Sequence, residues 1–182
     1  MGSTHATRLA PGNPRRTEVN EAMEIRTARP EDAPAIWAIL EPTIRAGETY
    51  ALPQDMTQTE AIAYWMGPDR ETFVAEEDGR LFGTYYLRAN QLGGGSHVAN
   101  CGYVTSTEST GRGIARMMCT HSLERARARG FRAMQYNFVV STNERAVRLW
   151  QGFGFEIVGT LPGAFAHPKL GYVDALVMFK SL

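Results

Sequence analysis

A glycine-rich turn between a strand pattern and a helix pattern constrains the fold more than any other feature of the sequence. Residues 104–115 read VTSTESTGRGIA and join the strand-like run 97–106 to a helical period over 111–129. Glycines let a backbone turn tightly and present its amides, and free N–H groups at the positive end of a helix suit a pyrophosphate. A plain strand-to-helix turn explains the glycines equally well, so this turn alone leaves both interpretations open.

The surroundings of this turn exclude two common nucleotide-binding loops. A Walker loop requires a Gly-Lys-Ser/Thr sequence, and none follows here. The Rossmann fingerprint belongs on the first strand-to-helix turn of a parallel unit, whereas this turn comes after three adjacent strand-like runs. The turn therefore belongs to a different kind of α/β sheet.

The remaining periodicity predicts an α/β fold with a mixed sheet of about seven strands and about four helices. The predicted strands cover 24–29, 72–77, 80–89, 97–106, 132–140, 155–161 and 172–180, the last two joined by a Pro/Gly-rich connection. The first helix opens at Pro30 and is disturbed by Pro42, and Thr57 or Thr59 caps the second. The third helix lies within 111–129, and a capping box at 141–144 opens the fourth. Residues 1–22 are expected to be a flexible tail, and 23–182 one domain.

Composition excludes several classes of function. Nineteen basic residues balance nineteen acidic ones, so no global field attracts nucleic acid or an anionic membrane. Two cysteines, Cys101 and Cys119, are too few for a disulfide scaffold or a zinc cage, and we expect them to be reduced and buried. No apolar run approaches the roughly 20 residues that span a bilayer, and the first residues contain no hydrophobic region of the kind found in signal peptides. We expect a cytoplasmic protein without a metal.

Two motifs in the right order resemble the GNAT acetyltransferase family. The family's Arg/Gln-x-x-Gly-x-Gly/Ala signature is met by Thr110, Gly113 and Ala115, with Thr110 departing from the usual Arg or Gln. The sequence NERAVRLWQGFGF at 143–155 matches the family's Asn-x-x-Ala-x-x-Leu-aromatic helix followed by Gly-Phe. The resemblance implies a mixed sheet splayed in the middle, with acetyl-CoA as the co-substrate. It assigns acetyl-CoA binding to Tyr103, Val104, Thr105, Thr110, Gly111, Arg112, Gly113, Ile114, Ala115 and Asn143.

A narrower resemblance indicates a class of acceptor. The blocks at 95–103, 131–143 and 158–174 are similar to the fungal L-azetidine-2-carboxylate N-acetyltransferases, which detoxify proline analogues by acetylating a ring amine. The implied substrate is a small amino acid or proline analogue such as azetidine-2-carboxylate or hydroxyproline. Two alternatives stay open. One is a primary-amine acetyltransferase of the phosphinothricin or methionine sulfoximine type. The other is an inactive CoA-binding sensor, because Trp150 stands where many members have a Tyr that acts as the general acid.

The resemblance also assigns roles to individual side chains. Asn137 would polarise the thioester and Asn143 would contact the cofactor near its sulfur, which makes both catalytic, while a backbone N–H near 103–105 would bind the oxyanion. Asn100 would bind the acceptor's carboxylate. Asparagine is unusual in strand interiors, but a polar group satisfied at a bulge explains Asn100 and Asn137 without chemistry.

Other positions carry weaker expectations. A helix cap explains Asn143 without chemistry. Glu48 and Tyr50 are expected to contact substrate from the loop at 47–55, whereas His97 fits a surface strand end better than a general base. Trp150 is expected to pack in the core. The expected partners are a small-molecule amine and a second copy of the chain, with neither nucleic acid nor membrane.

Overall fold

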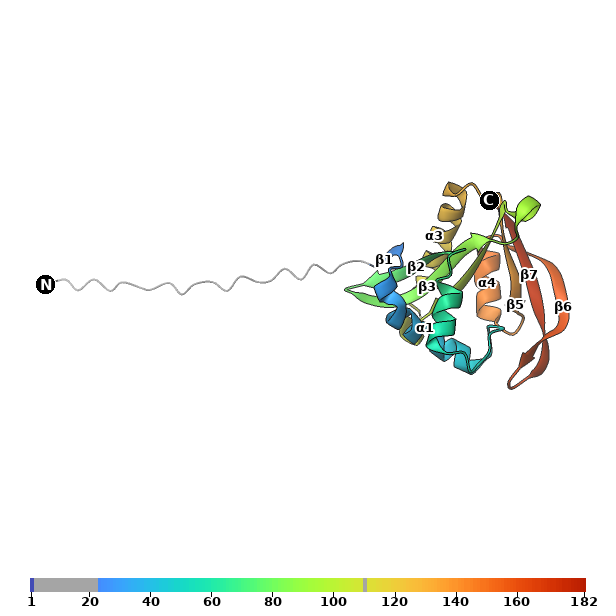
Figure 1. Cartoon of the computed structure of the whole chain (residues 1–182), viewed down its shortest axis with the longest axis horizontal. Coiled ribbons are helices and arrows are strands. Elements are labelled where there is room, and N and C mark those ends of the chain that lie inside the picture. The colour runs from blue at the N-terminus through green and yellow to red at the C-terminus, as the bar shows by residue number, and fades with distance from the viewer. Residues whose placement is uncertain (2–22, 110) are drawn as a thin grey trace.

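The computed structural model describes residues 1, 23–109 and 111–182, so the predicted tail beyond Met1, together with Thr110, lies outside the described residues. The described chain forms a seven-stranded sheet in the order β1-β2-β3-β4-β5-β7-β6 (Figure 1). Its strands are β1 (Glu24–Thr27), β2 (Glu71–Glu77), β3 (Arg80–Ala89), β4 (Val98–Thr105), β5 (Ala133–Val140), β6 (Glu156–His167) and β7 (Gly171–Ser181). Its helices are α1 (Ala33–Ala46), α2 (Gln58–Trp65), α3 (Ile114–Ala128) and α4 (Glu144–Gly152). The predicted fold class and element order are confirmed.

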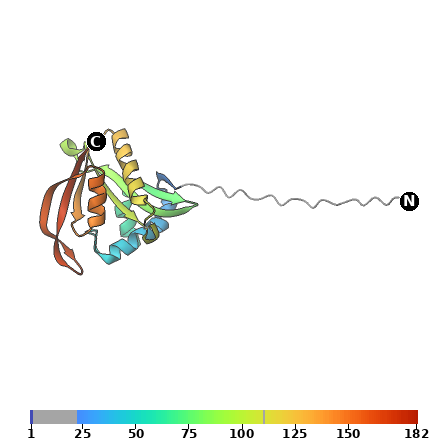
Figure 2. The same ribbon diagram turned by 180° about the vertical axis from the view of Figure 1, so that it is seen from behind.

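The central strands serve two apolar cores, one on each face of the sheet, because successive side chains of a strand point to opposite faces. Helices α1 and α2 cover one face, and α3 and α4 cover the other (Figures 1 and 2). Tyr85 and Leu87 of β3 join the α3–α4 core, while Tyr86 between them joins the α1–α2 core. Strands β3 and β4 can therefore contribute side chains to a site on either face of the sheet.

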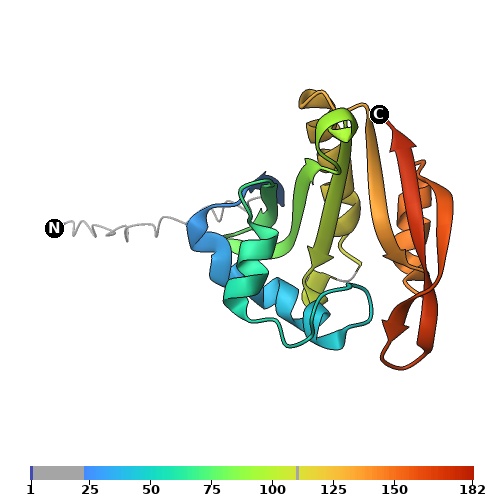
Figure 3. The ribbon, with the colours of Figure 1, turned by 45° about the vertical axis from the view of Figure 1, so that its right-hand side comes forward.

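The sheet splits between its two middle strands, as predicted. Strands β4 and β5 pair in parallel at only two positions, Val98 with Ala133 and Ala99 with Met134. Beyond these positions the strands diverge, while β4 keeps its antiparallel partner β3 and β5 keeps β7 (Figure 3). The divergence leaves backbone and side chains from the middle of both strands facing a common space.

Pro42, which is expected to disturb the first helix, does not end it. Helix α1 continues through Pro42 to Ala46 and ends at Gly47, whose φ is +62°. Proline removes one backbone hydrogen bond, but the apolar face on either side, which includes Leu40 and Ile44, is buried against the sheet. Tertiary packing therefore outweighs the local penalty.

Two further boundaries differ from the predictions. Strand β6 runs on to His167 through the expected Pro/Gly-rich connection, with register shifts between Leu161 and Phe165. It tolerates Pro162 because it lies at the edge of the sheet. The predicted capping box at 141–144 is also wrong, because Asn143 caps α4 instead.

The remaining sequence expectations concern capping, cysteines and membranes. Thr57, not Thr59, caps α2, with Glu60 completing the capping box. Cys101 and Cys119 are buried and free, as predicted. Over the described residues, no helix is long and apolar enough to cross a membrane.

Candidate active site

The glycine turn before α3 has the backbone geometry of an anion site. Gly111 and Gly113 adopt φ values of +80° and +75°, and a Cβ added to either would meet no heavy atom within 4 Å. Met117 N donates to Gly113 O as the first helical bond, so the N–H groups of Ile114 and Ala115 have no acceptor within the helix. This open, amide-rich helix start fits a pyrophosphate.

Arg112 contributes differently from its neighbours in this turn. Its backbone N–H already donates to Ser109 O, and its guanidinium pairs with Glu77 Oε2 at 2.6 Å and lies over the Phe82 ring. The guanidinium is thus engaged on the side of β2 and β3, and the backbone N–H within the turn itself. The N–H groups of Ile114 and Ala115, which have no acceptor within the helix, are the stronger candidates for phosphate binding.

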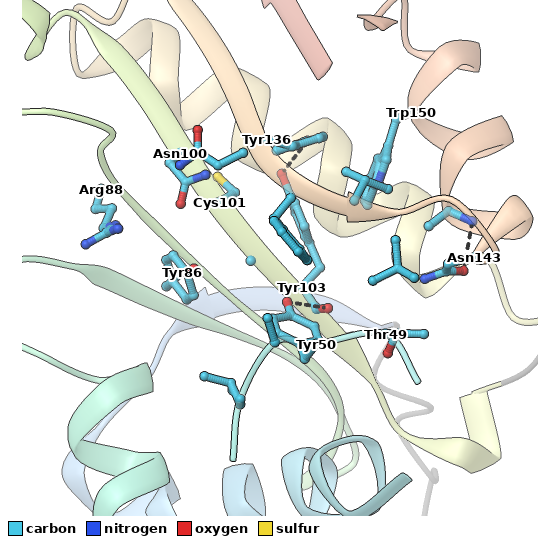
Figure 4. Close-up of a pocket in the computed structure, with 18 of the residues that line it drawn as sticks. Thr49, Tyr50, Tyr86, Arg88, Asn100, Cys101, Tyr103, Tyr136, Asn143 and Trp150 are labelled. Atoms are coloured by element: carbon cyan, nitrogen blue, oxygen red, sulfur yellow. Dashed lines mark hydrogen bonds between the residues drawn. The ribbon is translucent and has the colours of Figure 1, made fainter. Parts of the chain in front are cut away.

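A cleft of about 250 Å³ opens where β4 and β5 diverge (Figure 4). Five of the predicted site residues line it, namely Tyr50, Asn100, Tyr103, Asn137 and Asn143. The other lining residues are Thr49, Ala51, Leu52, Tyr64, Tyr86, Arg88, Cys101, Gly102, Tyr136, Phe138, Val139, Val140, Ala146 and Trp150. The cleft thus combines aromatic walls with amide groups, and its floor spans both strands.

Asn100 bridges the diverging strands. Its side chain is 7% exposed, and Nδ2 donates to Gln135 O at 2.9 Å. The side chain therefore satisfies a β5 carbonyl where the backbone ladder no longer reaches. This contact uses one of the two amide hydrogens of Asn100.

Asn137 sits in the irregular part of β5, between the register positions Tyr136 and Val139. Its Oδ1 accepts from Gln135 Nε2 at 2.8 Å, and its Nδ2 donates to Asn90 Oδ1 at 2.6 Å. The flanking amides fix the orientation of the Asn137 side chain and leave one Nδ2 hydrogen for another acceptor.

Asn143 is the N-cap of α4. Its Oδ1 accepts from Ala146 N at 3.3 Å. The capping bond uses the side-chain oxygen only, so the amide N–H₂ group of this cleft residue still has donors to offer. The cap and a contact with the cofactor are therefore compatible.

The backbone of β4 presents alternate amides to the divergence. Asn90 N donates to Val98 O and Ser106 N donates to Phe82 O, so the even-numbered residues of β4 direct their backbone groups toward β3. The N–H groups of Tyr103 and Thr105 point the other way, whereas that of Val104 faces β3. Tyr50 Oη donates to Tyr103 O at 3.1 Å, which is consistent with this direction.

A buried hydroxyl cluster lies behind the cleft. Tyr103 Oη is 2.7 Å from Ser122 Oγ and 3.0 Å from Tyr136 Oη. Burial raises the pKa of the Tyr50, Tyr103 and Tyr136 phenols well above the ordinary value, so all three stay protonated at neutral pH. None of these phenols supplies a base.

Trp150 packs as expected. It is 8% exposed, and its ring centroid lies 4.9 Å from that of Tyr103 and 5.0 Å from that of Tyr136. It forms part of the cleft wall beside α4 (Figure 4), where its role is packing.

Several predicted positions do not line the cleft. Glu48 pairs with Lys169 Nζ at 2.6 Å, and this lysine holds the pKa of the Glu48 carboxyl below its ordinary value. His97 is exposed. Val104, Thr105 and the turn 111–115 also lie outside the cleft lining, although they continue the same strand and helix start.

Sequence reasoning missed Arg88, a charged residue of the cleft wall. Arg88 lies near the end of β3 in register with Asn100. A charged residue near a strand end is usually solvated, so the pattern alone gave no reason to select it. The signal that finds it is the pairing with Asn100, which becomes visible only once the register is known.

Comparisons with known proteins identify the family. The model of the acetyltransferase (GNAT) family matches residues 33–155, more than half of the chain. The N-acetyltransferase aca1 of Schizosaccharomyces pombe is 29% identical over 151 residues, 74% of this chain and 72% of that protein.

Solved structures agree. A GCN5-related N-acetyltransferase from Kribbella flavida is 41% identical, with a TM-score of 0.85 over 88% of this chain and 98% of that one. A phosphinothricin acetyltransferase from Sinorhizobium meliloti, solved in complex with acetyl-CoA, is 21% identical with a TM-score of 0.77, covers 89% of each chain, and shows the fold alone. The chain therefore belongs to the GNAT family and is an acetyl-CoA-dependent N-acetyltransferase.

Proposed function

We propose that this enzyme acetylates the ring amine of a small cyclic amino acid of the azetidine-2-carboxylate or hydroxyproline type. The observation that carries the proposal is the cleft of about 250 Å³ at the divergence of β4 and β5, lined by Asn100, Asn137 and Asn143. A cleft of this size, with aromatic walls from Tyr50, Tyr86 and Tyr136, suits a compact acceptor. The resemblance to the azetidine-carboxylate acetyltransferases includes Asn100 and Asn137.

Acetyl-CoA supplies the acetyl group as a thioester. N–H groups at the start of α3, including those of Ile114 and Ala115, would hold its pyrophosphate. The N–H groups of Tyr103 and Thr105 face the divergence and would donate to the oxyanion that forms as the amine nitrogen bonds to the carbonyl carbon. Preformed donors of this kind lower the barrier because they need no reorganisation. The oxyanion then collapses to the amide as the carbon–sulfur bond breaks, and the CoA thiolate leaves and takes up a proton from water.

Three asparagines complete the proposed machinery. The Asn137 Nδ2 group, oriented by Asn90, polarises the thioester carbonyl. Asn143 contacts the cofactor near its sulfur, and Asn100 donates to the acceptor's carboxylate with the hydrogen that Gln135 O does not use. Amides suit these roles because they do not depend on a protonation state.

Within the part of the chain that the structure describes, no carboxylate or imidazole lines the cleft. The buried phenols stay protonated at neutral pH, so they cannot accept the amine's proton. We therefore propose that the amine loses its proton to water. Activity should rise with pH as the fraction of free amine increases.

A screen of CoA thiol release over cyclic secondary amino acids, linear amino acids and simple amines tests the proposal. We expect saturable turnover with azetidine-2-carboxylate or a hydroxyproline. Turnover of linear primary amines, with none of any cyclic amino acid, would replace the proposal by an acceptor of the phosphinothricin type. Because the chain is an N-acetyltransferase, the alternative of an inactive sensor falls away. A homodimer and a cytoplasmic location stay predictions.

A further inference from the structure

We propose that Arg88 binds the carboxylate of the acceptor, so that the cleft selects amino acids over amines without an anionic group. The inference rests on the proposed function, since it concerns the same cleft. It adds a specificity-determining residue on β3.

Arg88 brings the charge to the cleft. Among the described residues, it is the one Asp, Glu, Lys, Arg or His that lines the cleft. In Figure 4 its side chain lies beside Tyr86 and Asn100, at the end of the cleft away from Trp150 and Asn143. A bound ligand therefore meets a positive charge at one end and neutral amides at the other.

The charge of Arg88 is only partly neutralised by its neighbours. Arg88 Nη1 lies 3.2 Å from Asp69 Oδ2, and Arg70 Nε lies 3.2 Å from Asp69 Oδ1. Two guanidinium groups thus share one carboxylate, whose side chain is 56% exposed. The cluster carries a net charge of +1, which an anionic ligand group would balance.

Arg88 also has unused hydrogen-bonding capacity. Arg88 Nε and Arg70 Nη1 are buried and have no hydrogen-bond partner among the described residues. Buried donors on a charged group are costly to leave unpaired. A carboxylate can accept two parallel N–H bonds from a guanidinium, and Asp69 accepts from only one nitrogen of Arg88, so Arg88 has donors left for such a contact.

Aromatic side chains hold the cluster of Arg88, Asp69 and Arg70 in place. The Arg70 guanidinium lies 4.2 Å from the ring centroid of Tyr64 and 4.7 Å from that of Tyr86. Gly102 allows the Tyr86 ring to cross β4, because a Cβ there would lie 2.6 Å from the ring. Asp69 then aligns Arg88 beside this aromatic platform.

The register connects this charge to the reacting groups. Arg88 pairs with Asn100 across β3 and β4, and both side chains point to the α1–α2 face of the sheet. Asn100 Nδ2 is partly used by Gln135 O, so the guanidinium supplies the larger share of the carboxylate's attraction. A carboxylate held here leaves the amine directed toward β5 and Asn137. Polyamines and lysine-rich peptides are disfavoured by the same charge.

The test compares two acceptors with two variants. L-azetidine-2-carboxylate and L-azetidine-2-carboxamide are assayed at equal concentrations of unprotonated amine with the parent enzyme and with Arg88→Gln. We expect the parent to prefer the acid by at least about tenfold in kcat/KM. Arg88→Gln should lose that preference, chiefly because KM for the acid rises. The kcat/KM of this variant for the carboxamide should stay within about threefold of the parent value.

Arg80→Gln is the matched control, because Arg80 lies on the same strand, pairs with the exposed Glu108 and is outside the cleft lining. It should leave the acid preference unchanged. Calorimetric binding of acetyl-CoA checks that each variant is folded, and Arg88→Lys replaces Arg88→Gln if the latter does not fold. Arg88→Lys should keep the charge but lose the two-pronged contact, so the acid preference should fall only in part.

The proposal is overturned if the parent has the same kcat/KM for the acid and the carboxamide. It is also overturned if Arg88→Gln lowers kcat/KM equally for both acceptors, as the loss of a purely structural residue would. Failure of the proposed function looks different, because cyclic amino acids would then not be acetylated at all. The role of Arg88 is then decided by the same comparison on another pair of acceptors. That pair is the best primary-amine amino acid from the screen and its carboxamide. A best acceptor that carries no carboxylate overturns it.

Discussion

Asn137 uses both ends of its side-chain amide, since Oδ1 accepts from Gln135 and Nδ2 donates to Asn90. A group held in this way has its second Nδ2 hydrogen fixed in direction. We expect Asn137→Ala to lower kcat by roughly 10²-fold, the effect typical of losing one polarising donor. Steady-state kinetics of thiol release measure this change.

The control for this prediction is Trp150→Phe, which keeps an aromatic ring beside Tyr103 and Tyr136. Because we assign no proton transfer to the indole, this variant should keep most of the parent turnover. An Asn137→Ala enzyme that is folded and turns over like the parent would remove Asn137 from the mechanism.

Asn100 is expected to act on binding. An amide that donates to a carboxylate does so in the ground state and in the transition state, so its loss should appear mainly in KM. We predict that Asn100→Ala raises KM for the acceptor by roughly tenfold or more with a smaller change in kcat. A fall in kcat alone would contradict this role. Because Nδ2 also bridges to Gln135 O, thermal unfolding should be recorded in parallel.

Single residues were predictable from sequence where their chemistry was out of place. Asparagine is rare within strands, so Asn100 and Asn137 stood out, and both line the cleft. Arg88 and Glu48 are residue types common at such positions, so the sequence does not indicate which of the two lines the cleft. The register of β3 brings Arg88 to the cleft, whereas Glu48 pairs with Lys169 and is not among the lining residues.

At the scale of elements, the start of α3 is the most specific feature. We predict that Gly113→Val lowers acetyl-CoA affinity at least about tenfold, because a β-branched side chain would occupy space that phosphate needs. Isothermal titration calorimetry measures this affinity.

Gly130 provides a matched control at the other end of α3. Its φ of +80° is close to the +75° of Gly113, and a Cβ at either position meets nothing within 4 Å. Both Val variants therefore carry similar backbone strain, of about 1–2 kcal/mol. Gly130→Val should lose stability but bind acetyl-CoA normally. Equal affinity in the two variants would exclude the turn from the cofactor site.

Element types and order were predictable because strand alternation, helical periodicity and capping signals agreed along most of the chain. Boundaries were not predictable where tertiary contacts overrode a local signal. Pro42 lies within α1 because the helix face on both sides is buried, and β6 passes Pro162 because an edge strand needs fewer backbone donors. Neither contact is visible from local sequence.

At the scale of the whole molecule, an ion-pair cluster joins segments that are distant in sequence. Arg26 of β1 donates to Asp32, at the turn before α1, and to Glu76 of β2. The Arg26 hydrogen bond is the main cause that holds the pKa of Asp32 below its ordinary 3.8. The cluster fixes the first strand and the first helix to the sheet edge.

This depressed pKa predicts a pH dependence of stability. A carboxyl whose pKa is lower when folded contributes stability that is complete above its unfolded pKa and is lost as pH falls through the folded pKa. The melting temperature should therefore fall as pH drops below 3.8. Asp32→Asn should be less stable at neutral pH and show a flatter decline in acid.

Glu41→Gln is the comparison, since it removes an exposed i,i+4 pair with Arg45. Exposed pairs contribute little, so this variant should follow the parent curve. Melting curves from about pH 6 to about pH 2 give the comparison. An Asp32→Asn curve parallel to that of the parent would show that other carboxyls govern acid unfolding.

The loop between α1 and α2 is held over the cleft at two places of opposite character. Outside, Glu48 pairs with Lys169 of the turn between β6 and β7, and inside, the Tyr50 hydroxyl donates to Tyr103 O. Dissolved ions screen the exposed ion pair, whereas the part-buried hydrogen bond between neutral groups is much less sensitive to them. Rising ionic strength should therefore weaken the outer attachment of this loop before the inner one.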